Sequence, residues 1–305
     1  MTTTMTSTKH LIVVVGATGS GKTDISLRLA THFGAPIIST DSRQVYKGIP
    51  IGTAQPTAEQ LAAVEHHFIA SHSLTDNFNC GEYEVQALAR LEELFRAHDV
   101  VVAVGGSGLY IQALCEGMDD LPQADEQLRQ SLMERLQNEG IESLLADLER
   151  LDPDYYAQVD HCNPSRVVRA VEVCMQTGQP YSSLRKGERH KRNFNIIKIG
   201  IEWERATLYD RINRRVDMMI DEGLEAEARS VYHLRQLNSL QTVGYREMFD
   251  YFDGTTTREE AIELIKRNSR RYAKRQMTWF RRDADIEWFN ASDVESMIDF
   301  LDNKI

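Results

Sequence analysis

The chain has 305 residues, enough for one large domain or two modest ones, and its 42% hydrophobic and 27% charged content is ordinary for a globular protein. The net charge of −11 argues against nucleic-acid binding by the surface as a whole. No apolar run is long enough to predict a membrane span, and the N-terminal residues do not have the layout of a secretory signal. The four cysteines are scattered without a C-x-x-C pair, which argues against a zinc site and against disulfides and favours the cytoplasm.

Residues 1–9 are expected to be disordered, and the first structured segment is 11–23, LIVVVGATGSGKT. Its five apolar residues predict a buried strand, and the pattern G-x-x-x-x-G-K-[ST] that follows is typical of a phosphate-binding loop. Glycines let backbone N–H groups curl around phosphate oxygens, and the following helix adds its partial positive charge. The alternative is an ordinary glycine-rich turn with a surface lysine. The predicted phosphate-binding residues are Gly16, Ala17, Thr18, Gly19, Ser20, Gly21, Lys22 and Thr23.

The next elements are a helix over 23–33 and a short strand over 36–40, which places Asp41 at the carboxyl end of a strand. In open α/β sheets that edge carries the ligand, so we expect Asp41 to face the phosphate loop. A carboxylate there could hold Mg²⁺ through water or act as a general base, and the alternative is a turn-capping aspartate. Residues 41–56 are predicted to form a long loop beside the site.

A helix over 82–97 and a strand over 100–104 continue the alternation, which predicts a mostly parallel sheet. This strand ends in Gly105-Gly106-Ser107-Gly108. A Walker-type ATPase would place a Mg²⁺-binding aspartate there, and this chain has glycine instead.

From about residue 118 the pattern becomes helical, with a helix start at Asn163 and a stop at Gly178. Strand character returns at 195–201. The sequence therefore predicts an α/β fold: a P-loop NTPase-like, mostly parallel sheet core (1–117 and 196–305) with helices on both faces, and an inserted all-helical domain (118–195).

Helices are predicted over 205–221 and 223–237, followed by a loop that holds 241–246. On the first of these helices Arg211 and Arg215 share one face. A planar guanidinium suits developing phosphate charge, so Arg215 is the predicted reaching arginine, and a solvated ion pair is the alternative for any one of them.

The last elements are a long helix over 257–282, a strand over 285–289 and a final helix. From Lys266 to Arg282 eight residues are basic and none is acidic, with aromatic residues among them. Uncompensated positive charges repel one another, so this helix is predicted to bind nucleic acid, by phosphate contacts and base stacking. A solvated charged helix is the alternative.

Eight stretches resemble, in register from residue 11 to about 290, the bacterial-type tRNA dimethylallyltransferases (isopentenyltransferases). One departure is Ser107, where the family usually has threonine, and the hydroxyl is retained. The stretches are GATGSGKT (16–23), STDSRQVYKGIPIGTAQP (39–56), GGSGLY (105–110), LPQADEQLR (121–129), NPSRVVRAVEV (163–173), RINRRVDMMIDEGLEAEAR (211–229), QTVGYRE (241–247) and RYAKRQMTWFRR (271–282).

The resemblance implies transfer of a dimethylallyl group from dimethylallyl diphosphate to N6 of adenosine 37 in tRNA. It implies that the phosphate loop holds the donor's diphosphate, with Mg²⁺ on Thr23, and not ATP. Asp41 would take the amine proton, while Lys22, Thr23 and Arg215 would stabilise the departing diphosphate.

The insertion would bind the anticodon loop of the tRNA. The protein itself is expected to be a monomer in the cytoplasm. By the same resemblance, the tRNA-contacting positions are Asp41, Ser42, Arg43, Gln44, Ser107, Arg129, Ser165, Arg166, Val167, Val168, Arg169, Gln241, Thr242, Val243, Gly244, Tyr245, Arg246, Lys274, Arg275, Gln276, Trp279 and Arg281.

Three other functions are compatible with parts of the pattern. A nucleoside or nucleotide kinase would also use the phosphate loop, but it leaves the basic helix without a role. Relatives that prenylate free adenine nucleotides would not need 163–173 or 266–282. A non-enzymatic RNA-binding switch would leave Asp41 without a task.

Overall fold

The computed structural model describes residues 8–187 and 189–305. Of residues 1–9, for which disorder is expected, 1–7 lie outside the described residues, whereas Lys9 is placed and its ammonium pairs with Asp99 at 2.7 Å. The chain forms two compact units. The sheet unit comprises the chain up to Cys115 together with Arg192–Ile305, and the helical unit comprises Glu116–Lys191. The predicted insertion, 118–195, begins and ends a few residues later in the sequence than the helical unit of the structure.

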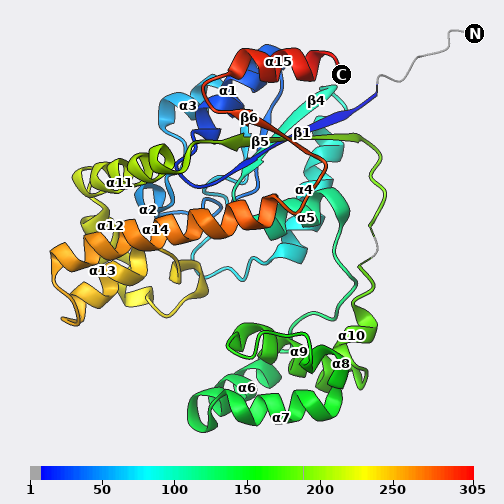
Figure 1. Ribbon diagram of the computed structural model, residues 1–305, viewed down its shortest axis with the longest axis vertical. Helices are drawn as coiled ribbons and strands as arrows, with labels where there is room; N and C mark the ends of the chain where they lie inside the picture. Colours follow the sequence, from blue (N-terminus) through cyan, green and yellow to red (C-terminus); the bar gives the residue numbers. More distant parts are fainter. Residues whose placement is uncertain (1–7, 188) are drawn as a thin grey trace, which may run out of the picture. The chain divides into compact units, whose positions relative to one another are not determined.

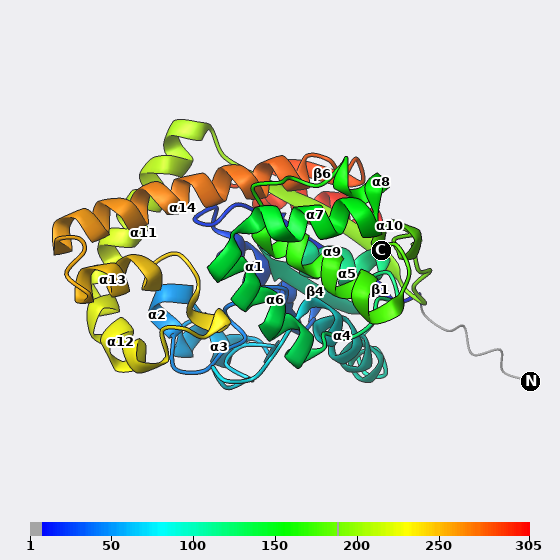
Figure 2. The ribbon, with the colours of Figure 1, turned by 90° about the horizontal axis from the view of Figure 1, so that it is seen from below.

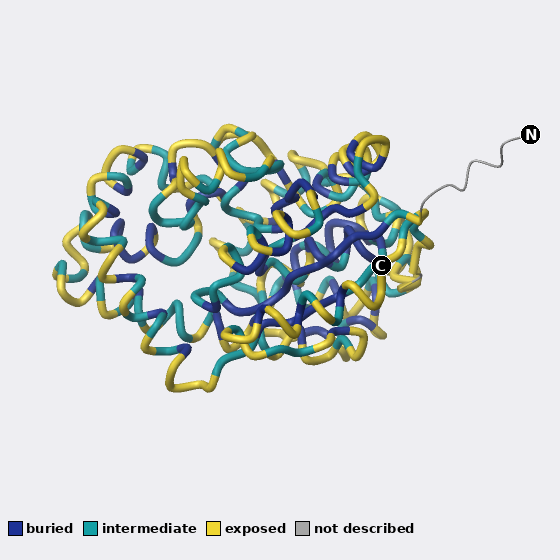
Figure 3. Tube along the Cα trace, turned by 90° about the horizontal axis from the view of Figure 1, so that it is seen from above, coloured by how far each residue is buried: buried dark blue, intermediate teal, exposed yellow. Residues whose placement is uncertain are grey.

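The sheet unit is built on six parallel strands in the order β3-β2-β4-β1-β5-β6 (Figure 1). Parallel strands covered on both faces need continuous apolar sequence, and Leu11–Val15 is fully buried (Figure 3). The predicted P-loop NTPase-like fold is confirmed. The strands are β1 (His10–Gly16), β2 (Ile37–Ser39), β3 (His66–His67), β4 (Val100–Gly105), β5 (Asn195–Glu202) and β6 (Ile286–Asn290).

Helices cover both faces of the sheet (Figure 1). Ile12 and Val14 of β1 pack with α1 (Lys22–Phe33) and α15 (Val294–Asp302) on one face. Alternation along the strand turns Leu11, Val13 and Val15 to the other face. Three helices cover that face: α4 (Cys80–Leu94), α5 (Gly108–Glu116) and α14 (Arg258–Phe280).

The other helices of the sheet unit lie beyond the carboxyl edge of the strands, where α11 packs along α14 and α12 packs against α13 (Figure 2). They are α2 (Pro50–Thr53), α3 (Ala58–Ala63), α11 (Arg205–Asp221), α12 (Leu224–Val231), α13 (Tyr245–Phe252) and two 3₁₀ turns, η1 (Tyr232–Leu234) and η2 (Asn238–Leu240).

The helical unit has its own apolar core, which includes Leu132, Leu144 and Leu148. The Asn163 side chain accepts a hydrogen bond from the backbone of Arg166, and Gly178 ends the same helix at φ 68°, so both predicted ends of this helix are confirmed. The helices are α6 (Glu126–Glu139), α7 (Ile141–Leu151), α8 (Pro153–Tyr156), α9 (Pro164–Thr177) and α10 (Tyr181–Leu184).

Two sequence-based expectations differ from the structure. The helix predicted over 223–237 ends at Val231, and the predicted loop 241–246 already enters α13 at Tyr245, after Gly244 at φ 102°. Helices α3 and α5, like the two-residue strand β3, were not predicted. Within the described residues, no helix is long and apolar enough to cross a membrane.

Candidate active site

A cavity of about 820 Å³ opens in the sheet unit at the carboxyl ends of β1, β2 and β4. The phosphate loop and Asp41 both line it, together with α11 and α14. The edge of a parallel sheet where strands end is the expected position of a ligand. The cavity therefore brings together the two strongest candidates of the sequence.

The phosphate loop lies between β1 and the N-terminus of α1. Gly19 and Gly21 adopt φ of 78° and 89°, values that L side chains rarely reach. The Lys22 ammonium donates to the Ala17 carbonyl at 2.7 Å. Burial, with help from the Arg215 charge, lowers the pKa of Lys22 to about 7, while the Asp41 carboxylate opposes the shift. An anion in the loop would favour the charged lysine.

Gln276 of α14 holds the start of the phosphate loop. Its Oε1 accepts from the Thr18 N–H at 2.8 Å, and its Nε2 donates to the Gly106 carbonyl at 2.9 Å. The side chain is 6% exposed, and both ends of its amide are used within the protein. Gln276 thus bridges two loops at the strand ends while it also lines the cavity, and its predicted contact with tRNA stays a prediction.

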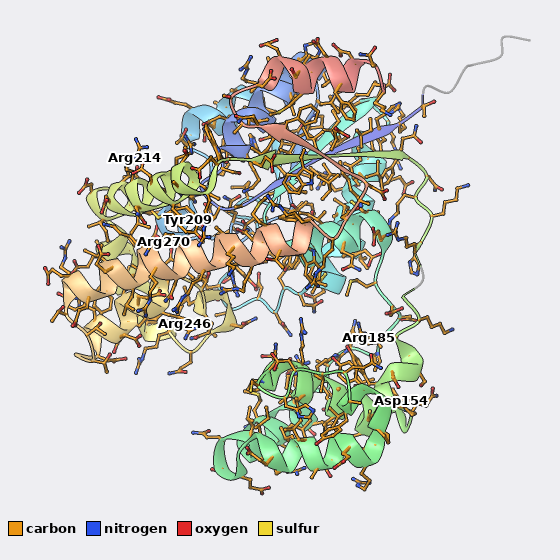
Figure 4. All side chains as sticks on the ribbon, viewed as in Figure 1. Asp154, Arg185, Tyr209, Arg214, Arg246 and Arg270 are labelled. Atoms are coloured by element: carbon orange, nitrogen blue, oxygen red, sulfur yellow. The ribbon has the colours of Figure 1, made fainter. Side chains whose placement is uncertain are left out.

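Three arginines of α11 have different surroundings. Arg215 donates to the Thr18 hydroxyl at 3.3 Å, and Arg211 Nε donates to the Gly19 carbonyl at 3.0 Å. Arg214 is exposed and pairs with Asp210 (Figure 4). Burial lowers the pKa of Arg215, and Asp41 and Glu222 oppose this shift. The helical spacing thus brings Arg211 and Arg215 to the loop and leaves Arg214 in solvent.

Asp41 has both a structural and an open carboxylate oxygen. Its Oδ1 accepts from the backbone N–H groups of Arg43 at 2.8 Å and Gln44 at 3.3 Å, which is the turn-capping role considered as the alternative. Its Oδ2 accepts no hydrogen bond from any described residue, and the side chain lines the cavity. One carboxylate can therefore cap the turn and still accept a proton.

The end of β4 has no room for a side chain. A Cβ on Gly105 would lie 2.2 Å from Thr40 Oγ1, and one on Gly106 would lie 2.2 Å from Gln276 Nε2. A carboxylate at the Walker position would therefore clash. Ser107, next in sequence, accepts from the Ser42 N–H at 3.0 Å and so joins the β4 end to the loop after β2.

The loop 41–56 is held by partly buried contacts that the sequence does not predict. Glu227 of α12 accepts from the N–H groups of Ile51 and Gly52, each at 2.8 Å, and from the Tyr245 hydroxyl. Tyr245 is fully buried, and its predicted contact with tRNA stays a prediction. Its neighbours 241–244 and Arg246 line the cavity, and Arg246 is exposed.

The basic helix carries less free charge than its sequence indicates. Lys266 pairs with Asp217 at 2.7 Å, and Arg281 lies 3.6 Å from Glu202, so the expectation of a helix without counter-charges is wrong in part. Arg270 donates to Asn213 of α11 (Figure 4). The basic side chains of α14 and the residues just after it that are exposed and form no ion pair within 8–187 and 189–305 are Arg267, Arg271, Lys274, Arg275 and Arg282.

In the helical unit the predicted tRNA positions divide by burial. Ser165 and Arg166 are exposed at the start of α9. Val167 and Val168 are 0% and 4% exposed because they pack in the core of this unit, and their predicted tRNA contacts stay predictions. The motif that suggested them contains both faces of an amphipathic helix.

Arg129 and Arg169 share a fully buried partner. Both guanidiniums donate to Glu172 Oε2, at 2.6 and 2.9 Å, and Arg169 also donates to the Pro122 carbonyl. Both arginines are only partly buried, which leaves guanidinium surface for an anion. Their positions are thus fixed by a carboxylate that the sequence did not single out.

No cluster of three or more histidine, cysteine or acidic side chains that could hold a metal occurs in the described part of the chain. Thr23, in the first turn of α1, lines the cavity, and its hydroxyl has no hydrogen-bond partner among the described residues. One hydroxyl beside a phosphate site matches Mg²⁺, which usually keeps several waters and binds substrate phosphates.

The chain is similar to a known protein family and to several of its members. The model of the IPP transferase family matches residues 44–283. The chain is 50% identical over 297 residues to tRNA dimethylallyltransferase 1 of Bacteroides fragilis (97% of this chain, 99% of the relative). It is 52% identical over 280 residues to tRNA dimethylallyltransferase 2 of Porphyromonas gingivalis (92% and 93%).

Solved structures agree with these relatives. The crystal structure of the tRNA isopentenylpyrophosphate transferase of Bacillus halodurans is similar with a TM-score of 0.72 and 38% identity, covering 97% of this chain and 96% of that one. A eukaryotic dimethylallyltransferase acting on tRNA gives 0.77 at 26% identity, covering 94% and 75%.

Proposed function

The chain belongs to the IPP transferase family, and from this membership we propose that it transfers a dimethylallyl group from dimethylallyl diphosphate to N6 of adenosine 37 in tRNA. One observation supports this chemistry above the others. The phosphate loop and the open oxygen of Asp41 line the same cavity, while the neighbouring strand end has no room for the carboxylate that an ATPase would use.

In the proposed reaction the N6 amine attacks the first carbon of the dimethylallyl group. The bond from that carbon to the diphosphate oxygen breaks, the new N6–carbon bond forms, and the diphosphate leaves with the bonding electrons. The proton of N6 passes to Asp41 Oδ2, because an aromatic amine is a weak nucleophile and Oδ1 is already used by the turn.

The departing diphosphate gains negative charge as the bond breaks. Lys22, Arg215 and the N-terminus of α1 surround the place where it would lie and stabilise that charge. Thr18 is fixed by Gln276 through its N–H and by Arg215 through its hydroxyl, so the loop is held in position before the donor arrives.

Mg²⁺ is proposed as the metal, bound by the Thr23 hydroxyl, water and the donor's phosphate oxygens. When bound, it neutralises diphosphate charge. Chelation of divalent cations by EDTA is expected to abolish transfer, and transfer at an undiminished rate would remove the metal from the proposal.

The proposed acceptor is the anticodon stem-loop of tRNA. The exposed basic residues Arg271, Lys274 and Arg275 of α14 supply phosphate contacts, and the helical unit, through Arg129 and Arg169, grips the loop. The target adenosine must leave its stack, at a cost of a few kcal/mol. We further propose that the protein acts as a monomer in the cytoplasm, where this substrate occurs.

Replacement of Asp41 tests the assignment of the base. Asp41→Asn keeps an oxygen to accept from Arg43 and Gln44, so the turn persists while proton acceptance is lost. We expect near-complete loss of transfer with tRNA binding kept, and the same for Asp41→Ala. Turnover of Asp41→Asn at the unsubstituted rate would exclude Asp41 as the base.

A further inference from the structure

Two side chains that follow β5 in the chain hold consecutive carbonyls of the phosphate loop. Trp203, between β5 and α11, donates its indole N–H to the Ser20 carbonyl at 2.9 Å. Arg211 donates Nε–H to the Gly19 carbonyl at 3.0 Å. The Arg211 guanidinium also stacks 4.8 Å from the centre of the Trp203 ring, so the two donors fix each other.

Because the peptide bond is planar, a hydrogen bond to a carbonyl of the loop also fixes the direction of the N–H group in the same peptide. In a trans peptide the C=O and the N–H that share one plane point in opposite directions. The Ser20 carbonyl is drawn toward Trp203, so the Gly21 N–H points away from the indole. Gly21 lines the cavity and Trp203 does not. Within the described residues the Gly21 N–H has no hydrogen-bond partner.

The Arg211 contact acts in the same way on the preceding peptide. Holding the Gly19 carbonyl turns the Ser20 N–H away from Arg211, and this N–H donates to the Ala17 carbonyl at 3.2 Å, inside the loop. Ile212, next to Arg211, packs against the same peptide: a Cβ on Gly19 would lie 2.9 Å from its Cγ1. Two successive residues of α11, Arg211 and Ile212, therefore contact the phosphate loop at Gly19.

We propose that Trp203 and Arg211 form a clamp that holds the phosphate loop so that the N–H group of Gly21 binds the terminal phosphates of a diphosphate ligand. In this arrangement Trp203 is a positioning residue that never touches the ligand, whereas Arg211, which lines the cavity, adds its charge. The clamp deepens the proposed function and rests on it only for the identity of the ligand as the prenyl donor.

Trp203→Phe is the main variant, because phenylalanine keeps an aromatic ring for Arg211 to stack on and has no indole N–H. Calorimetry with inorganic diphosphate and Mg²⁺, on the full chain, measures the site without turnover. We expect binding to weaken about fivefold, the factor contributed by one ordinary hydrogen bond. The KM for dimethylallyl diphosphate should rise by a similar factor, with the KM for tRNA and the thermal midpoint unchanged.

Trp288→Phe is the matched control, since Trp288 lies in β6 against Gly200 and away from the loop; it should leave diphosphate binding unchanged. If Trp203→Phe lowers the thermal midpoint, Arg211→Lys provides the second test, because it keeps the charge and loses the Nε–H and the planar stack. Diphosphate binding at the original affinity in Trp203→Phe would overturn the clamp. Weakened binding in a protein that transfers no prenyl group would retain the clamp and refute the proposed reaction.

Discussion

Replacing Gln276 by leucine tests whether this buried amide organises the donor site. Leucine has a similar volume but makes neither hydrogen bond, so the buried Gly106 carbonyl and the Thr18 N–H both lose their partner. An unsatisfied buried polar group costs ~1–3 kcal/mol. Thr18 is half-buried and can recover part of this through water, so we expect destabilisation of about 2–4 kcal/mol. Because the phosphate loop loses its tether, the KM for the prenyl donor should also rise.

Urea denaturation followed by circular dichroism, together with steady-state kinetics in both substrates, measures the two effects. Thr278→Ala is the matched control on the exposed side of the same helix and should change stability by less than ~0.5 kcal/mol. An unaltered denaturation midpoint and donor KM in Gln276→Leu would refute the bridging role. An increase in the KM for tRNA alone would instead favour the sequence-based assignment of Gln276 to tRNA contact.

Two further predictions concern charge. The pKa of about 7 for Lys22 means that the free site loses its ammonium as pH rises through 7, so kcat/KM for the prenyl donor should fall above that pH. Lys22→Met, assayed with the same donor over the same pH range, should lose this dependence. An identical pH profile in the variant would assign the dependence to another group. Glu172→Gln leaves Arg129 and Arg169 around a neutral amide. Thermal melts should therefore show the helical unit destabilised by about 2 kcal/mol, and steady-state assays should show an increased KM for tRNA. An unaltered melt and an unaltered KM would contradict this arrangement.

Local patterns predicted the elements that depend on near neighbours in the chain. The buried strand Leu11–Val15, the loop after it and the ends of α9 follow from apolar runs, glycine spacing and capping residues. These signals act over a few residues, so one sequence suffices to recognise them. The position of Asp41 at the cavity also followed, since it needs only the rule that parallel strands present ligands at their carboxyl ends.

Contacts between distant segments were missed because no local signal records them. Gln276 reaches a loop that lies 258 residues earlier in the chain. Its helical spacing from the buried Ala273 and Phe280 marks the apolar face of α14, and that periodicity could have separated it from the exposed Lys274 and Arg275.

Family motifs do not separate buried residues from exposed ones, for a related reason. The motif around 163–173 spans a whole helix, so it includes Val167 and Val168, which pack inward, as well as Ser165 and Arg166, which face solvent. Tyr245 was placed in a loop although it begins α13 and bonds to Glu227 inside the protein. A motif identifies a family without stating which of its residues fold the protein and which touch the substrate.

The most direct test of the proposed function is to incubate the protein with radiolabelled dimethylallyl diphosphate, Mg²⁺ and unmodified tRNA, with AMP and ATP as parallel acceptors. We predict label in tRNA alone, at N6 of adenosine 37. Label in the free nucleotides would make the protein a nucleotide prenyltransferase. Consumption of ATP with no label transferred would contradict the account, because the phosphate loop would then serve a kinase.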